Sequence, residues 1–343
     1  MKKNIAFVLL IISFAMIGCG KKSSNPSPAS SMPAETLSKK KVLYIDSYFR
    51  GYEWNDGITN GILEVFGAKL NDDDTVDNSQ SKVELRIVRM DTKRHGSEEF
   101  KKQAGLIAKD VIESWRPDVV ITSDDNAFKY VIADFYRDTN LPVVFCGLNW
   151  DASLYGAPYK NTTGMVEVSL IEQVVEQLKK YAKGSRMGFL GEECETTRKE
   201  ALYYKKLFKM EFAEEYVTTF AQWKSKFLDM QEKFDLVLMY NNAAINDWNK
   251  EEAAKFAFNN TKIPVGGVMG WMAPYSLLIY STAPEEQGQW SANAALEILN
   301  GRKPSDIPLV TNKTAKIFLN MKMAKKLGIV FPIELVNQAE FVE

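Results

Sequence analysis

The sequence predicts an α/β fold made of two doubly wound parallel-sheet lobes. Short apolar segments without polar alternation recur along the chain, and segments with helical spacing of apolar residues separate them. Strands of a parallel sheet read as continuous apolar runs because helices cover both faces of the sheet. Two such series follow one another in a chain of 343 residues, which is long enough for two domains.

The first series begins at residue 41. Its apolar runs lie at 41–46, 83–90, 117–123 and 141–147, and helical segments to about 70, over 97–115 and over 126–137 separate them. The acidic segment 71–78 departs from the spacing of a calcium loop and is interpreted as a solvated loop.

The second series has the same alternation. Strands are expected at 164–168, 185–191, 213–220, 234–240, 263–269 and 277–282, and helices at 169–182, 196–210, 221–232, 245–259 and 285–300. Asn300-Gly301 is a helix-ending signal. Ligands bind at the carboxyl ends of the strands in open α/β sheets, so a site between two lobes is expected there.

The N-terminus has the features of a secretory signal. Lys2 and Lys3 precede the apolar stretch 5–17, and Cys19 follows "MIG", which resembles the bacterial lipobox. We expect residues 1–18 to be a lipoprotein signal peptide, Cys19 to be lipidated, and 19–40 to be a Ser-, Pro- and Lys-rich tether. An ordinary signal peptide is the alternative. The protein is then an extracytoplasmic, membrane-anchored lipoprotein.

Composition and motifs exclude several classes of function. A formal charge of −1 without a basic stripe argues against nucleic acid as a partner. The single histidine, His95, has basic neighbours and no catalytic spacing, and neither a nucleophile elbow nor a metal-binding or phosphate-binding motif occurs. We therefore expect no catalysis, no cofactor and no metal, and a monomer. Cys146 and Cys194 are expected to be unpaired thiols.

The segments at the predicted strand ends resemble a known family. They read "DSYFRGYEWNDGI" (46–58), "SDDNAFKYV" (123–131) and "VFCGLNW" (144–150), and "PEEQGQWSANAALEILNGRKPSDIPL" (284–309) and "NMKMAKKLGIVFPIELVNQA" (320–339) follow in order. Over about 41–340 the chain resembles the substrate-binding proteins of ABC transporters with the type I periplasmic binding protein fold.

The resemblance implies a division of the chain. An N-terminal lobe of 41–148 plus about 284–303 and a C-terminal lobe of 149–283 plus about 304–343 are expected. Three chain crossings near 147–151, 281–284 and 303–308 would join them, and the return strand after the last crossing would belong to the second lobe.

The resemblance also implies a function. The lobes would close around a small polar or zwitterionic solute, such as the aromatic amino acids that some relatives take, and deliver it to an ABC permease. A ligand-sensing lipoprotein that signals to a membrane receptor is the first alternative, and an extracytoplasmic α/β enzyme is the second.

Candidate ligand-binding residues lie at the strand ends. Hydroxyl groups, aromatic rings, carboxylates and amides suit a polar solute. The first lobe offers Ser47, Tyr48, Tyr52, Trp54, Ser123, Asp124, Asp125 and Asn149, and the second offers Glu192, Asn241, Trp271 and Thr282. Three of them have structural alternatives: Trp54 as a core residue, Asp125 as a helix cap, and Asn149 as a loop brace.

Overall fold

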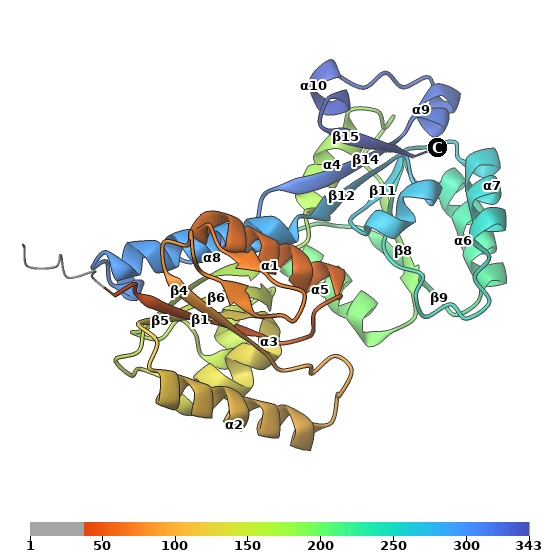
Figure 1. The fold of residues 1–343 in the computed structure, drawn as a ribbon. Helices are drawn as coiled ribbons and strands as arrows, with labels where there is room; N and C mark the ends of the chain where they lie inside the picture. Colours follow the sequence, from red (N-terminus) through yellow and green to blue (C-terminus); the bar gives the residue numbers. More distant parts are fainter. Residues whose placement is uncertain (1–37, 343) are drawn as a thin grey trace, which may run out of the picture. The chain divides into compact units, whose positions relative to one another are not determined.

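The computed structural model describes residues 38–342 and contains two main β-sheets, each with its own helices (Figure 1). A hairpin of β2 (Lys69–Leu70) and β3 (Val76–Asp77) forms a third, small sheet within the acidic segment. None of the helices among these described residues is long and apolar enough to cross a membrane. The predicted signal peptide and Cys19 lie outside the described residues.

The first sheet is entirely parallel and has the order β13-β7-β6-β5-β1-β4. Its strands are β1 (Lys41–Asp46), β4 (Glu84–Arg89), β5 (Val119–Ser123), β6 (Val143–Asn149), β7 (Thr162–Glu167) and β13 (Val310–Thr311). Side chains of β1 alternate between two apolar cores: Tyr44 packs in one, and Leu43 and Ile45 pack in the other. Both faces of the strand are therefore buried, as its continuous apolar run predicts.

Helices cover both faces of this sheet. On one face α1 (Glu53–Phe66) packs beside α8 (Pro284–Leu299), although more than 200 residues separate them in the sequence (Figure 1). On the other face lie α2 (Glu98–Trp115) and α3 (Asp124–Ala127), and a π-helical segment (Phe128–Ala133) continues α3. The helix expected from 126 thus begins directly at the end of β5.

Glycines allow α1 and α8 to approach very closely. A Cβ atom on Gly61 would clash with the carbonyl oxygen of Glu285, and one on Gly288 would clash with the carbonyl oxygen of Ile58. Backbone atoms cannot move aside as a flexible side chain can. The two helices therefore form one closely packed pair.

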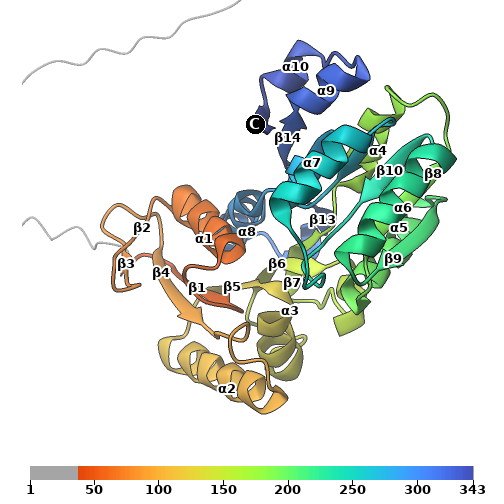
Figure 2. The same ribbon diagram turned by 90° about the vertical axis from the view of Figure 1, so that its right-hand side faces the viewer.

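The second sheet has the order β15-β14-β12-β11-β10-β8-β9. Its strands are β8 (Met187–Glu192), β9 (Ala213–Val217), β10 (Leu236–Met239), β11 (Val265–Gly267), β12 (Leu278–Thr282), β14 (Ala315–Asn320) and β15 (Ala339–Val342). In the part of this sheet that the structure describes, β12 and β14 are the one antiparallel pair. α4 (Ile171–Lys179) precedes β8 and packs on this sheet, and the later helices are α5 (Glu195–Phe208), α6 (Phe220–Lys233), α7 (Lys250–Asn260), α9 (Met321–Leu327) and α10 (Ile333–Val336). Figure 2 shows α6 over β8 and β10, against which it packs.

Two strands lie in a different sheet from the one the sequence analysis expected. β7 pairs with β6, and β13 pairs with β7, so both belong to the first sheet. The chain consequently passes between the sheets at 168–170, at 283 and at 312–314, and not near 147–151 and 303–308. The apolar run of a strand indicates that the strand is buried, but it does not indicate which strands lie beside it. The sequence alone therefore cannot assign a strand to one of the two sheets.

Candidate functional site

A buried ion pair anchors the end of β1. The Asp46 carboxylate is inaccessible to solvent and lies 2.6 Å from the Arg89 guanidinium at the end of β4. The Asn55 side chain and the Tyr48 amide also donate hydrogen bonds to Asp46. Burial raises the pKa of Asp46, and these donors and Arg89 oppose that rise. The ion pair fixes the turn that carries Tyr48.

Ser47 and Ser123 brace the turn through buried hydrogen bonds. Both are fully buried. The Ser47 hydroxyl donates to the Ser123 carbonyl at 2.6 Å and accepts from the Ala127 amide at 2.8 Å. The Ser123 hydroxyl lies 2.9 Å from the Tyr44 hydroxyl. The hydroxyl groups of both residues form hydrogen bonds within the protein, and a direct contact with the ligand stays a prediction.

Asp124 is a buried carboxyl group held by two donors. Its side chain accepts from Trp54 Nε1 at 3.0 Å and from Asn55 Nδ2 at 2.9 Å, and the residue is 3% exposed. Burial and the nearby charge of Asp46 raise the pKa of Asp124 to about 7. Its φ of 65° lies in the left-handed region. Trp54 is half-buried, and its indole N–H holds the Asp124 carboxyl group. It is therefore neither a fully buried core residue nor a ring free to contact a ligand on all sides.

Asp125 lies next to this carboxyl group but is only half-buried. It accepts from Asn149 Nδ2 at 2.6 Å and from the Tyr155 hydroxyl at 2.8 Å, and it makes no helix cap. Asn149 therefore braces Asp125. The pair joins the ends of β5 and β6.

Two tyrosine rings lie at the end of β1. Tyr48 and Tyr52 are half-buried and meet edge to face, with ring centroids 5.4 Å apart. The ammonium group of Lys93, which follows β4, lies 4.9 Å from the Tyr48 centroid and 5.0 Å from the Tyr52 centroid. Such a position over aromatic faces attracts a cation. This end of the sheet therefore presents rings, carboxylates and a cation together.

In the second sheet, Glu192 braces a loop. It is buried, and it accepts hydrogen bonds from Asn241 Nδ2 at 3.0 Å and from the amide of Ala244. Asn241 in turn accepts from Trp271 Nε1 at 3.0 Å, and the Trp271 side chain is 58% exposed. Both carboxylate oxygens of Glu192 thus accept a hydrogen bond from this loop, and its contact with a ligand stays a prediction. Thr282 ends β12 and is half-exposed.

A buried contact that the sequence does not predict lies near the first crossing between the sheets. Glu200 of α5 accepts from Trp150 Nε1 at 3.0 Å and from the Ser169 hydroxyl at 2.9 Å. Trp150 also stacks on Tyr203 with centroids 5.1 Å apart. Nothing in the spacing of Trp150 and Glu200 along the chain indicates this contact. Cys146 and Cys194 are free thiols, and no group of metal ligands occurs among residues 38–342.

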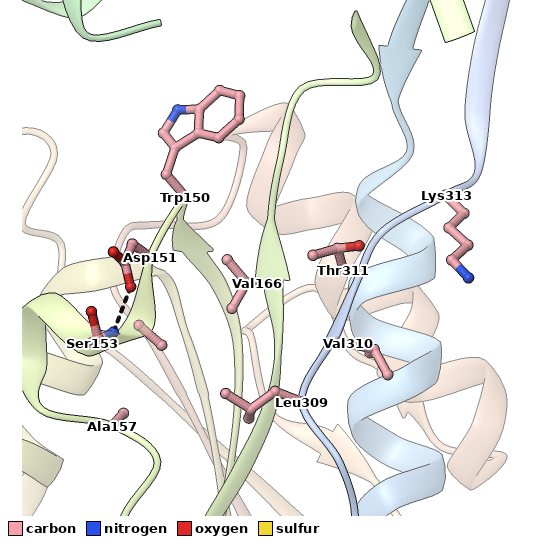
Figure 3. A pocket seen from close by; sticks show the side chains of 10 residues that line it. Trp150, Asp151, Ser153, Ala157, Val166, Leu309, Val310, Thr311 and Lys313 are labelled. Atoms are coloured by element: carbon pink, nitrogen blue, oxygen red, sulfur yellow. Dashed lines mark hydrogen bonds between the residues drawn. The ribbon is translucent and has the colours of Figure 1, made fainter. Parts of the chain in front are cut away.

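A pocket of about 500 Å³ lies beside these strand ends and does not include the predicted ligand residues. Figure 3 shows Val166 between the loop that carries Asp151 and Ser153 and the segment 309–311. The pocket is lined by Trp150, Asp151, Ala152, Ser153, Ala157, Val166, Leu309, Val310, Thr311 and Lys313. Most of these side chains are apolar or small, so the pocket lacks the convergent polar groups expected at the solute site.

Comparisons with known proteins agree with this architecture. The ligand-free, open structure of CD0873, a substrate-binding protein with adhesive properties from Clostridium difficile, aligns with a TM-score of 0.65 and 16% identity, over 88% of this chain and 99% of that one. A periplasmic ribose ABC transporter protein from Conexibacter woesei aligns at 0.52 and 14%, over 85% and 96%. A conserved domain protein from Vibrio cholerae aligns at 0.51 and 18%, over 89% and 100%. At these identities the alignments establish the fold alone.

The sequence itself identifies the family. Residues 87–343, three quarters of the chain, match the family described as "ABC transporter substrate binding protein". No curated protein gave a significant match. Proteins of this family bind small solutes outside the cytoplasm for an ABC transporter and do not transform them. The chain therefore belongs to the ABC transporter substrate-binding protein family.

Proposed function

We propose that this protein binds a small zwitterionic solute of the amino-acid class, with aromatic amino acids first among the candidates, and delivers it to an ABC permease. The observation that supports the proposal is the meeting of half-buried rings and charges at the carboxyl ends of the first sheet. Tyr48 and Tyr52 offer ring faces, and Asp125 is a half-buried carboxylate beside them. Rings bind apolar or aromatic surface, and carboxylates bind an ammonium group.

Closure of the two lobes is the proposed mechanism. The second lobe would contribute Asn241, Trp271 and Thr282 to the bound solute, and Trp271 has a large exposed ring for that purpose. Exclusion of water on closure strengthens each charged hydrogen bond. The solute therefore shifts the population of the protein toward the closed form, and the permease binds the closed form.

A thermal-shift screen of the full chain with the twenty proteinogenic L-amino acids tests the proposal. A binder present at a hundredfold excess over its Kd stabilises the folded state by about 2.7 kcal/mol. At least one amino acid is expected to raise the Tm in this way. If none does and a sugar or nucleoside does, the assignment of the solute class is wrong.

Tyr48→Ala locates the site. The loss of a half-buried ring at the strand end is expected to weaken binding of the best amino acid at least tenfold, about 1.4 kcal/mol. Phe135→Ala is the matched control because Phe135 is an exposed ring on the π-helical side of the sheet. Equal affinity in both variants would place the solute elsewhere.

The same proposal includes a lipid anchor at Cys19. The supporting observation is the order of basic residues, apolar stretch and Cys19 at the N-terminus. Cys19→Ser is expected to move the protein from the membrane fraction to the soluble fraction. Retention of Cys19→Ser in membranes would contradict the anchor. An adjacent pair of genes for a permease and an ATPase would support uptake, and a receptor gene in their place would support sensing.

A further inference from the structure

Lys93 is a cation held in place at the strand-end site. The loop that follows β4 is tied to the turn after β1, because the Asp91 amide donates to the Tyr48 carbonyl at 2.8 Å and the Thr92 amide donates to the Ser47 carbonyl at 3.0 Å. These bonds bring the Lys93 ammonium over the Tyr48 and Tyr52 rings. Lys93 is exposed, and it takes part in none of the ion pairs formed among residues 38–342.

Glu167, the last residue of β7, is a carboxylate on the same side of the sheet. Asn149 and Glu167 are register partners on adjacent strands, so their side chains share one face. The Asn149 side chain reaches Asp125, which places Glu167 on the Asp125 face. The preceding residue, Val166, points to the opposite face and lines the pocket in Figure 3.

The Glu167 side chain has no internal partner among the described residues: neither a hydrogen bond nor an ion pair within 38–342 includes it. Burial raises its pKa well above the ordinary value, and the charges of Asp124, Glu200 and Asp125 add to the rise, whereas Lys93 opposes it. A half-buried carboxylate among like charges gains more from a cationic ligand group than a solvated one does.

We propose that Lys93 and Glu167 bind the two charged groups of the zwitterion. Lys93 binds the ligand carboxylate, and Glu167, with Asp125 beside it, binds the ligand ammonium. This inference rests on the proposed function and assigns its specificity to two residues. The ring faces of Tyr48 and Tyr52 hold Lys93 in position, so the charge is available before the ligand arrives. A solute that lacks either charge leaves one of the two residues unpaired.

The test compares affinity ratios and not affinities alone. The best-bound L-amino acid is measured beside its decarboxylated amine and its deaminated acid by calorimetry with the full chain; for L-tyrosine these are tyramine and 3-(4-hydroxyphenyl)propionate. The wild-type protein is expected to prefer the amino acid to both analogues by at least tenfold. Lys93→Met is expected to lose the preference over the amine, and Glu167→Gln is expected to lose the preference over the deaminated acid.

Four further variants make the result specific. Lys93→Arg and Glu167→Asp keep the charges and are expected to keep both preferences. Arg94→Met and Glu193→Gln remove exposed charges that already have partners, Asp91 and Arg198, and are expected to leave both ratios unchanged. Unchanged ratios in Lys93→Met and Glu167→Gln would overturn the inference while the proposed function stands. A change in one variant only would overturn the assignment of the other residue. Failure of every amino acid to bind the wild type would instead refute the proposed function.

Discussion

Asp124→Asn should make the stability of the protein less dependent on pH. The Asp124 carboxyl group is 3% exposed; within 38–342 it takes part in no ion pair, and Trp54 and Asn55 donate hydrogen bonds to it. Asparagine has the same shape and tolerates the left-handed backbone at φ 65°. The substitution therefore removes the titration without forcing a change in the turn.

The magnitude follows from linkage. The pKa of Asp124 rises from the ordinary value of 3.8 to about 7 in the folded protein. The folded state thus binds a proton more tightly than the unfolded state, so this stability is fully present below pH 3.8 and is lost as the pH rises through 7. About three pKa units at 1.36 kcal/mol each correspond to a loss of about 4 kcal/mol in the free energy of unfolding.

Denaturant unfolding between pH 4.5 and pH 8 measures this loss. Asn supplies one acceptor where Asp supplies two, so Asp124→Asn is expected to be the less stable protein at pH 4.5 and to gain on the wild type by roughly 2–4 kcal/mol by pH 8. Asp138→Asn is the matched control, because Asp138 also has a positive φ of 55° but is exposed. Parallel profiles for wild type and Asp124→Asn would refute the reasoning.

Two substitutions test the packing that supports the site. Gly288→Ala places a Cβ atom against the Ile58 carbonyl oxygen and is expected to destabilise the protein by about 1–3 kcal/mol in urea unfolding, whereas Gly96→Ala enters open space and is expected to have little effect. An equal effect of both would show that α1 and α8 are not closely packed. Trp150→Phe removes a hydrogen bond to the buried Glu200 carboxylate and is expected to lower the free energy of unfolding by about 1–3 kcal/mol; an unchanged Tm would mean that this bond adds nothing.

The strand and helix series could be read from the sequence because both periodicities are strong in this chain. Residues 41–46 form the expected buried strand, and the helix expected at 97–115 begins one residue later, at Glu98. The strand is a continuous apolar run, and the helix has apolar residues at helical spacing. The placement of β7 and β13 could not be read, because pairing between distant strands leaves no local pattern.

The candidate site was partly predictable for the same reason. The strand-end pattern predicts candidates at the ends of β1, β5 and β6. The two residues proposed to bind the charged groups of the solute, Lys93 after β4 and Glu167 at the end of β7, are not among those candidates. Glu167 is not among them because the sequence places its strand in the other lobe, whereas β7 pairs with β6 in the first sheet. The sequence does not indicate that Ser47 braces the turn, because a hydroxyl group at a strand end can bond either to the protein or to a ligand.

The packing of α1 against α8 gives the protein a mechanical link. The first turn of α1 carries Trp54 and Asn55, which hold Asp124, and α8 begins at the crossing that follows β12. Glycines bring the two helices together backbone to backbone, and a Cβ atom on Gly57 of α1 would clash with Pro284 at the start of α8, so the two helices begin side by side. The turn at the strand ends and the segment that crosses between the sheets at 283 therefore lie at the same end of one closely packed helix pair, so the first lobe carries both on a single stiff unit.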